Sequence, residues 1–139
     1  MSDHSPVAIP PLFLDRMKSL LGEEDYLAFA GSLNAVPRSG LRVNTLKLSP
    51  EKFAEISPFK LAGKVPWCPS AYTLEGESRP GLHPYHMAGL YYLQDPSAMS
   101  PAELLFPLPG ERVLDLSAAP GGKTTHLAAL MQGKGIGKP

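Results

Sequence analysis

The chain has 139 residues, 43% of them hydrophobic, and its 13 basic side chains balance its 13 acidic ones. This length supports one ordinary domain, or a small domain plus part of another. The apolar content excludes a disordered tail and the neutral charge excludes a strongly electropositive nucleic-acid binder, so any contact with nucleic acid must come from a local patch.

Two helices are predicted in the N-terminal segment. Apolar residues recur at helical spacing over residues 11–21, and Gly22, followed by three acidic residues, marks a stop and a fresh start. A second helix is predicted over residues 23–33 and is expected to turn apolar side chains such as Leu27 inward.

A strand and a capped helix are predicted next. The run LRVNTLKL, residues 41–48, is short, partly β-branched and bounded by turn residues, which favours a strand with Arg42 and Asn44 on one face. Ser49 followed by Pro50 is typical of an N-cap and a first helical position, so a short helix is predicted there.

Prolines and glycines interrupt the middle of the chain, over residues 58–81. Residues 65–74 form at best an irregular edge strand, because prolines lie inside them. Residues 90–94, LYYLQ, are a clearer strand. Asp95-Pro96 and then Ser100-Pro101-Ala102-Glu103 predict two successive helix starts, the second with a capping-box pattern.

The C-terminal part predicts a strand, a loop and a helix. Residues 112–116, RVLDL, are almost continuously apolar and suit a buried parallel strand. A helix is predicted from about Thr124 to Met131, with Gly133 placed to end it. The remaining residues, 132–139, supply glycine, lysine and proline where a second apolar strand should begin.

Several other kinds of site are disfavoured. Cys68 is the only cysteine, which excludes a disulfide framework and a cysteine-rich zinc site and favours a reducing compartment. His83 and His86 are more typical of packing or surface residues than of metal ligands, so no metal is expected. No apolar run reaches transmembrane length, and Asp3 lies where a secretory signal would be basic. We therefore expect a cytoplasmic protein without membrane contact.

The loop between the last strand and helix, SAAPGGK at residues 117–123, has the composition of a ligand site. A helix N-terminus gathers free backbone N–H groups and the positive end of the helix dipole, which favour an anion. Gly121 and Gly122 lack a Cβ, so the backbone can approach a ligand closely or adopt a positive φ there. Ala118 and Ala119 keep the loop slim.

Three ligands are compatible in part with this loop. Gly122-Lys123-Thr124 matches the end of the nucleotide-binding pattern G-x-x-x-x-G-K-[ST], but Ser117 replaces the first glycine and Pro120 removes one N–H. A dinucleotide requires G-x-G-x-x-G, whereas the glycines here are adjacent. S-adenosylmethionine could place its carboxylate on the loop N–H groups, while Asp115 organises the loop or binds the amino group of the cofactor.

The third ligand agrees with a family resemblance. VLDLSAAPGGKTTHLA, residues 113–128, resembles the cofactor motif D-x-[CS]-A-A-P-G-G-K-T of RNA 5-methylcytosine methyltransferases of the Nop/Sun family. LRVNTLK, residues 41–47, resembles their R-V-N-T-L strand, and GLYYLQDPSAM, residues 89–99, resembles their G-x-Y-x-Q-[DE]-x-[SA]-S segment. The three segments follow in the order of the family over residues 41–131.

The resemblance implies an α/β fold in two parts. A small N-terminal α/β domain, residues 1–88, would help to seat ribosomal or transfer RNA. Residues 89–139 would begin a Rossmann-like S-adenosylmethionine-dependent methyltransferase domain, incomplete after its first cofactor-binding strand, loop and helix. The cofactor-binding residues that the resemblance implies are Ser117, Ala118, Ala119, Pro120, Gly121, Gly122 and Lys123.

Basic side chains have further expected roles. Lys123 would meet the cofactor carboxylate or position the loop, and its simpler role is that of an ordinary first-turn helix residue. Arg38, Arg42 and Lys47 are candidate phosphate contacts, or alternatively solvated positions.

The chemistry of the family requires a cysteine. Carbon 5 of cytosine is a poor nucleophile, so a thiolate must first add at carbon 6 before the sulfonium methyl can be attacked. In the family two cysteines do this work, and both follow the cofactor loop. Here Cys68 precedes the loop without a basic neighbour, which indicates a structural role. The acid that would hold the ribose hydroxyls is also absent.

We therefore expect the N-terminal portion of a methyltransferase that acts on carbon 5 of cytosine in RNA, with ribosomal RNA as the favoured substrate. Alone, this portion is expected to be inactive and to bind the cofactor weakly. The alternatives are a stand-alone RNA-binding or assembly module and a P-loop-like nucleotide binder.

Overall fold

The computed structural model describes residues 8–35, 39–76 and 79–138, the last three of these without their side chains. The chain forms two units, residues 1–37 and 38–139. Arg38, one of the candidate phosphate contacts, lies outside the described residues. None of the helices within the described ranges is long and apolar enough to cross a bilayer.

The first unit contains α1, Pro11–Ser32, which is broken at Gly22. Gly22 has φ 76° and ψ 178°, a backbone conformation that interrupts a helix and that glycine adopts without a steric penalty. The predicted stop is therefore confirmed. Phe13 and Phe29, on either side of the break, approach with ring centroids 6.1 Å apart. The expectation that the second segment turns its apolar side chains inward is wrong for Leu27, which is 65% exposed.

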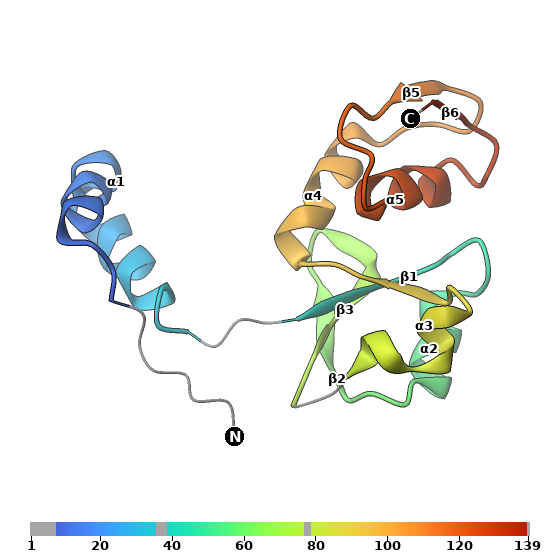
Figure 1. Ribbon diagram of the computed structural model, residues 1–139, viewed down its shortest axis with the longest axis horizontal. Coiled ribbons are helices and arrows are strands. Elements are labelled where there is room, and N and C mark those ends of the chain that lie inside the picture. The colour runs from blue at the N-terminus through green and yellow to red at the C-terminus, as the bar shows by residue number, and fades with distance from the viewer. Residues whose placement is uncertain (1–7, 36–38, 77–78, 139) are drawn as a thin grey trace. The chain divides into compact units, whose positions relative to one another are not determined.

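The second unit begins with a four-stranded antiparallel sheet in the order β2-β3-β1-β4 (Figure 1). Its strands are β1 (Gly40–Val43), β2 (Leu61–Val65), β3 (Cys68–Leu74) and β4 (Tyr91–Leu93). The helices that accompany it are α2 (Pro50–Ile56), the 3-10 turn η1 (Pro80–Leu82) and α3 (Pro84–Met87). The core of this sheet consists of Leu41, Val43, Phe53, Tyr72 and Tyr91. All four residues of β1 are buried.

The strand predicted over residues 41–48 ends at Val43, because Asn44 starts a turn. The Asn44 side-chain oxygen accepts a hydrogen bond from the backbone N–H of Leu46, and its amide donates to the carbonyl of Gly89. Asparagine stabilises turns through such local bonds. The helix after it begins as predicted, since Ser49 Oγ accepts the Lys52 N–H at 3.1 Å.

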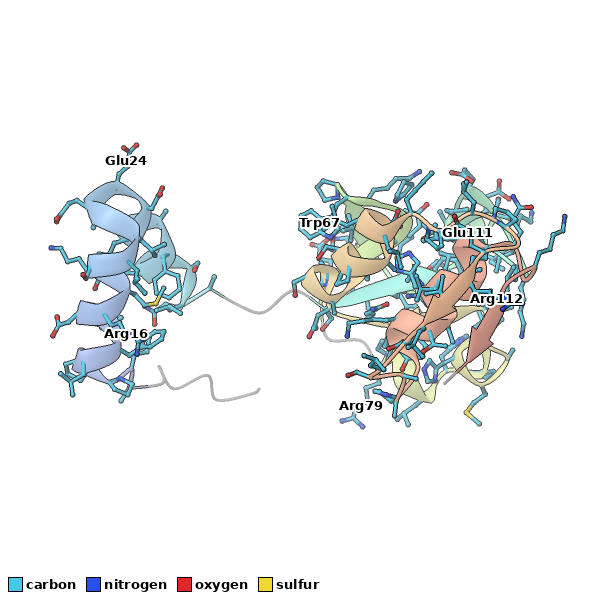
Figure 2. The ribbon with its side chains drawn as sticks, turned by 90° about the horizontal axis from the view of Figure 1, so that it is seen from above. Arg16, Glu24, Trp67, Arg79, Glu111 and Arg112 are labelled. Atoms are coloured by element: carbon cyan, nitrogen blue, oxygen red, sulfur yellow. The ribbon has the colours of Figure 1, made fainter. Side chains whose placement is uncertain are left out.

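The prediction of an edge strand over residues 65–74 is wrong, since β3 lies between β2 and β1. Pro69 is tolerated because the pairing of β3 with β1 begins only at Ala71. Trp67, in the turn between β2 and β3, is 48% exposed and lies at the surface (Figure 2). Its indole N–H donates to the carbonyl of Pro96 at 2.8 Å, so this turn is joined to the next helix.

A single helix, α4 (Pro96–Leu105), replaces the two predicted helix starts. Pro101 lies inside it and cannot donate to the carbonyl of Ser97. The hydroxyl of Ser100 donates to that carbonyl at 2.8 Å instead, which removes one cost of an internal proline.

The C-terminal part forms a strand–helix–strand unit. It comprises β5 (Arg112–Leu114), α5 (Gly122–Leu130) and β6 (Ile136–Lys138), and the two strands pair in parallel. Gly133, at φ 68°, follows the helix end as predicted. Two expectations are wrong: a second strand does form after the helix, and the first is not buried, since Leu114 is 65% exposed. The α/β class is confirmed.

Candidate functional site

Asp115 closes the loop between β5 and α5. One carboxylate oxygen accepts the backbone N–H of Ser117 at 3.0 Å, and the other accepts the hydroxyl of Thr124 at 2.7 Å. The Thr124 hydroxyl and the Ser117 N–H hold the pKa of Asp115 below its ordinary value of 3.8. Both oxygens thus accept hydrogen bonds from the loop and the first turn of the helix. Of the two expected roles of Asp115, organising the loop and binding the cofactor amino group, these contacts support the first.

Glycine occupies positions 121 and 122 for two different structural reasons. Gly121 precedes α5 with φ 108°, which favours glycine, and its carbonyl accepts the Thr125 N–H at 2.9 Å. A Cβ at Gly122 would lie 3.3 Å from Tyr92 Cε1 and 3.4 Å from Gln94 Nε2, so a larger residue requires these two side chains to shift by a few tenths of an ångström. The first N–H groups of α5 have no acceptor within the helix, as at any helix N-terminus.

The structure places all seven predicted cofactor residues in this loop and the first turn of α5. Ser117, Ala119, Pro120 and Lys123 are exposed, and Ala118, Gly121 and Gly122 are half-buried. Ser117 and Lys123 also line a groove of about 280 Å³. The other residues along this groove are Pro101, Ala102, Leu105, Val113, Leu114, Asp115, Leu116 and Leu127.

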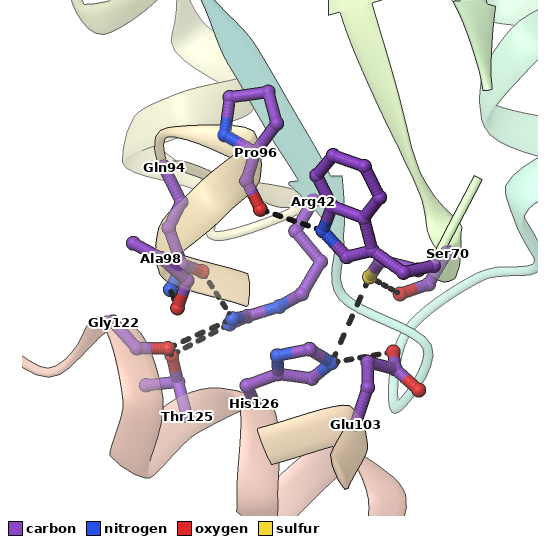
Figure 3. Close-up of polar contacts among 11 residues, drawn as sticks. Arg42, Ser70, Gln94, Pro96, Ala98, Glu103, Gly122, Thr125 and His126 are labelled. Carbon is purple, nitrogen blue, oxygen red and sulfur yellow. Dashed lines mark hydrogen bonds and ion pairs between the residues drawn. The ribbon is translucent and has the colours of Figure 1, made fainter. Parts of the chain in front are cut away.

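Arg42 lies behind this loop and is only 3% exposed. It donates from Nη1 to the carbonyl of Gly122 at 2.8 Å and to the side-chain oxygen of Gln94, and from Nη2 to Thr125 Oγ1 at 2.8 Å (Figure 3). Burial lowers the pKa of Arg42 to about 10, so the guanidinium still carries its charge at neutral pH. The expectation that Arg42 contacts RNA phosphate is therefore wrong, whereas Lys47 remains exposed.

Two further side chains, Tyr92 of β4 and Gln94 just after it, take part in the contact between Arg42 and the loop 117–123. The Tyr92 hydroxyl donates to the carbonyl of Pro120 at 3.1 Å, and the Arg42 guanidinium lies 5.7 Å from the centre of the Tyr92 ring. Gln94 accepts from Arg42 and donates to the carbonyl of Ala98 at 2.9 Å. The sequence patterns included Arg42 and Gln94 but gave no indication that their side chains contact the loop of residues 117–123, called the glycine loop below.

A second buried polar cluster joins β3, α4 and α5. His126 Nε2 lies 2.9 Å from a carboxylate oxygen of Glu103 and 3.8 Å from Cys68 Sγ. Burial raises the pKa of Cys68 to about 11, so the sulfur is a thiol at neutral pH. Sequence reasoning missed His126 and Glu103, because only the packing of α4 on α5 brings them together.

These three side chains have the donor atoms of a metal site, and their ligand atoms lie within 4.8 Å of one another. A metal on Nε2 would force the proton of neutral His126 onto Nδ1. That atom is buried without a hydrogen-bond partner in the part of the chain that the structure describes, and it lies on the side of the ring that faces Arg42 (Figure 3). Without a metal, the tautomer protonated on Nε2 can donate to the Glu103 carboxylate and leaves the Nδ1 lone pair facing the cation. The chemistry of the cluster therefore favours a metal-free polar network.

Known proteins match the chain across both halves of this site. The family model of the N-terminal domain of 16S rRNA methyltransferase RsmF matches residues 9–96, and that of 16S rRNA methyltransferase RsmB/F matches residues 102–136. Arg42, Tyr92 and Gln94 lie in the first match, and the glycine loop lies in the second.

Individual relatives are also similar to this chain over almost its whole length. The ribosomal RNA small subunit methyltransferase F of Vibrio vulnificus is 38% identical over 144 residues, and that of Erwinia tasmaniensis is 39% identical over 145 residues. These matches cover 96% and 97% of this chain but 30% of each relative, so the chain spans less than a third of their length.

A solved structure is also similar. The crystal structure of a methyltransferase homolog protein from Pyrococcus horikoshii has 32% sequence identity and a TM-score of 0.73, over 93% of this chain and 47% of that one. Because the first family model covers more than half of the residues, the chain belongs to the family of the 16S rRNA methyltransferase RsmF.

Proposed function

We propose that this chain supplies the cofactor loop and an RNA-seating domain of a methyltransferase that modifies carbon 5 of a ribosomal RNA cytosine with S-adenosylmethionine. The observation that carries the proposal is the loop 117–123, which is tied at both ends to Asp115 and opens onto the N-terminus of α5. The names of the relatives support rRNA as the substrate.

The residues present fit the amino-acid part of this cofactor. Gly121, at φ 108°, leaves a cradle without a Cβ in front of α5, and the unpaired N–H groups of the first helical turn match a carboxylate. Lys123 lies in the same turn and supplies a positive charge to that carboxylate. When bound, S-adenosylmethionine supplies an electrophilic methyl group on its sulfonium.

The division of labour follows the predicted domains. Residues 1–88 would seat the RNA and residues 89–139 would begin the methyltransferase domain, in a cytoplasmic protein. Within the described ranges, Cys68 is a buried thiol, so the cysteines for the attack on cytosine would come from the part of the relatives that this chain does not cover. The chain alone is then expected to bind cofactor weakly and to transfer no methyl group.

Calorimetric titration of the purified chain tests the cofactor. We expect S-adenosylmethionine and S-adenosylhomocysteine to bind, and Lys123→Ala to weaken both. Magnesium-dependent binding of ATP that is lost in Lys123→Ala would instead support a nucleotide binder. Binding to ribosomal RNA without any binding of S-adenosylmethionine would support a stand-alone RNA-binding module.

Transfer of a labelled methyl group to 16S rRNA tests the reaction. The chain alone is expected to be inactive, and transfer by the purified chain would contradict the assignment of the cysteines. A protein of full family length that labels a base other than cytosine would contradict the proposed chemistry.

A further inference from the structure

Three successive backbone carbonyl groups of the glycine loop accept hydrogen bonds from side chains. Pro120 O accepts the Tyr92 hydroxyl at 3.1 Å, Gly121 O accepts the Thr125 hydroxyl at 2.7 Å, and Gly122 O accepts Arg42 Nη1 at 2.8 Å. Arg42 Nη2 also donates to the Thr125 hydroxyl, so the guanidinium supports the middle contact as well. The orientation of the loop backbone thus depends on two side chains of the four-stranded sheet, Arg42 of β1 and Tyr92 of β4.

The charge of Arg42 has no carboxylate partner in its hydrogen bonds. Among the described residues its acceptors are an amide, a carbonyl and a hydroxyl, and its Nε has no hydrogen-bond partner. The Glu103 carboxylate attracts this cation without a hydrogen bond to it. Burying a cation without a direct ion pair costs stability that a well-packed apolar side chain would not. The guanidinium adds positive charge next to the end of α5 that already carries the positive helix dipole, and the Glu103 carboxylate offsets part of it.

The front of the loop is shaped by the same contacts. A Cβ at Gly122 would lie in tight contact with Tyr92 and Gln94, so the loop backbone packs closely against these side chains. Two of the three carbonyls are thus held by side chains of the four-stranded sheet and the third by Thr125 of α5, and these contacts leave the N–H groups of the first turn of α5 free of them.

We propose that Arg42 and Tyr92 are positioning residues for the cofactor, so that the four-stranded sheet, which includes Arg42 of the proposed RNA-seating domain, completes the cofactor site. Arg42 also strengthens the attraction for the cofactor carboxylate through its charge. This inference rests on the proposed function, because it assigns S-adenosylmethionine to the loop.

A matched pair of tyrosines provides the test. The Tyr92 hydroxyl donates to the carbonyl of Pro120 at 3.1 Å, and the Tyr72 hydroxyl donates to the carbonyl of Pro50, also at 3.1 Å. Tyr92→Phe and Tyr72→Phe therefore remove the same type of hydrogen bond at the same length, but only the first lies at the loop. We expect Tyr92→Phe to weaken S-adenosylmethionine binding about three- to tenfold, and Tyr72→Phe to change it less than about twofold.

Arg42 variants test the contribution of its charge. Arg42→Lys keeps a cation but lacks the planar fork that reaches three acceptors, whereas Arg42→Gln loses both. Cofactor affinity is expected to fall in the order wild type, Arg42→Lys, Arg42→Gln. Equal affinity of the two variants would overturn the contribution of the charge.

Amide hydrogen exchange in the ligand-free chain gives a readout that does not depend on the cofactor. Tyr92→Phe should accelerate exchange at Gly121, Gly122 and Lys123, and Tyr72→Phe should leave these amides unchanged. Equal exchange and equal affinity in the two variants would overturn the inference even if the wild type binds S-adenosylmethionine. If the wild type binds none at millimolar concentration, the proposed function fails instead, and the exchange data alone decide whether Tyr92 positions the loop.

Discussion

The hydroxyl of Thr124 donates a 2.7 Å hydrogen bond to Asp115, so the end of β5 and the first turn of α5 are joined across the cofactor loop. The bond favours the ionised carboxylate and holds the pKa of Asp115 below its ordinary value of 3.8. The stabilisation is therefore fully present above pH 3.8 and is lost as the pH falls through the lower pKa of the folded state.

Asp115→Asn should lower the melting temperature most at pH 5–7, where the wild-type carboxylate is ionised in both states. The difference between wild type and variant should shrink below about pH 4, as the unfolded chain takes up a proton that the folded protein still resists. Circular dichroism melts from pH 7 to pH 2.5 measure it. A difference that stays constant down to the lowest pH would show that ionisation of Asp115 contributes nothing.

His126 predicts a pH dependence in a different window. Burial and the nearby Arg42 cation lower its pKa below 6.5, while Glu103 opposes this, and Cys68 is its other polar neighbour. The unfolded chain then takes up a proton that the folded chain resists, so this contribution is present above pH 6.5 and is lost as the pH falls below it. Urea unfolding at pH 7.5 and 5.5 should show a smaller loss of stability in His126→Gln than in the wild type. An equal loss in both proteins would assign the effect to other groups.

The polar cluster also predicts the response to zinc. If neutral His126 donates its Nε2 proton to Glu103, a metal on this nitrogen leaves a buried N–H on Nδ1 with no acceptor. Zn²⁺ should therefore raise the melting temperature of wild type no more than that of Glu103→Gln, which lacks one of the three donors. A rise confined to wild type would reveal a metal site and reverse the assignment of the proton.

Cys68 should resist alkylation in the folded chain. Its side chain is fully buried, and burial raises its pKa from 9.0 to about 11, which lowers the thiolate fraction near neutral pH about a hundredfold. Mass spectrometry after iodoacetamide treatment at pH 7.5 should show modification at least about a hundredfold faster in urea than in buffer. Rapid modification of the folded chain would mean that the thiol is accessible and would reopen a reactive role.

Local chemistry accounts for the parts of the fold that the sequence predicted. Gly22 breaks a helix and Ser49 with Pro50 begins one, because each acts on neighbouring backbone groups. Gly133 takes part in the end of α5, where its N–H bonds the carbonyl of Ala128, but Gln132 is the first residue there with a positive φ. The loop motif likewise identified a contiguous group of candidate residues, which the structure keeps together.

Tertiary packing decided what the sequence did not predict. The central position of β3 depends on pairing with β1, and prolines alone had favoured an edge. The burial of Arg42 depends on Gly122 and Thr125, which are distant in sequence, so a strand pattern could not distinguish a phosphate contact from an internal support. The strand β6 forms by pairing with β5, despite a composition that favours a turn.

Gly40 connects the stability of the sheet to the cofactor loop and gives the last prediction. An added Cβ would lie 2.7 Å from the backbone oxygen of Gln94 and 3.1 Å from Pro96 Cδ, so Gly40→Ala must push the end of β4 away from β1. Gly63, in β2 of the same sheet, has no atom within 4 Å of an added Cβ and provides the matched control.

Gly40→Ala should lower the free energy of unfolding by about 1–3 kcal/mol, the usual cost of overpacking, whereas Gly63→Ala should change it by less than about 1 kcal/mol. Urea unfolding measures both. Because the displaced Gln94 is a hydrogen-bond partner of Arg42, Gly40→Ala should also accelerate amide exchange at Gly122, and Gly63→Ala should not. If Gly40→Ala destabilises the chain but leaves amide exchange at Gly122 unchanged, the loop does not depend on the spacing between β1 and the end of β4.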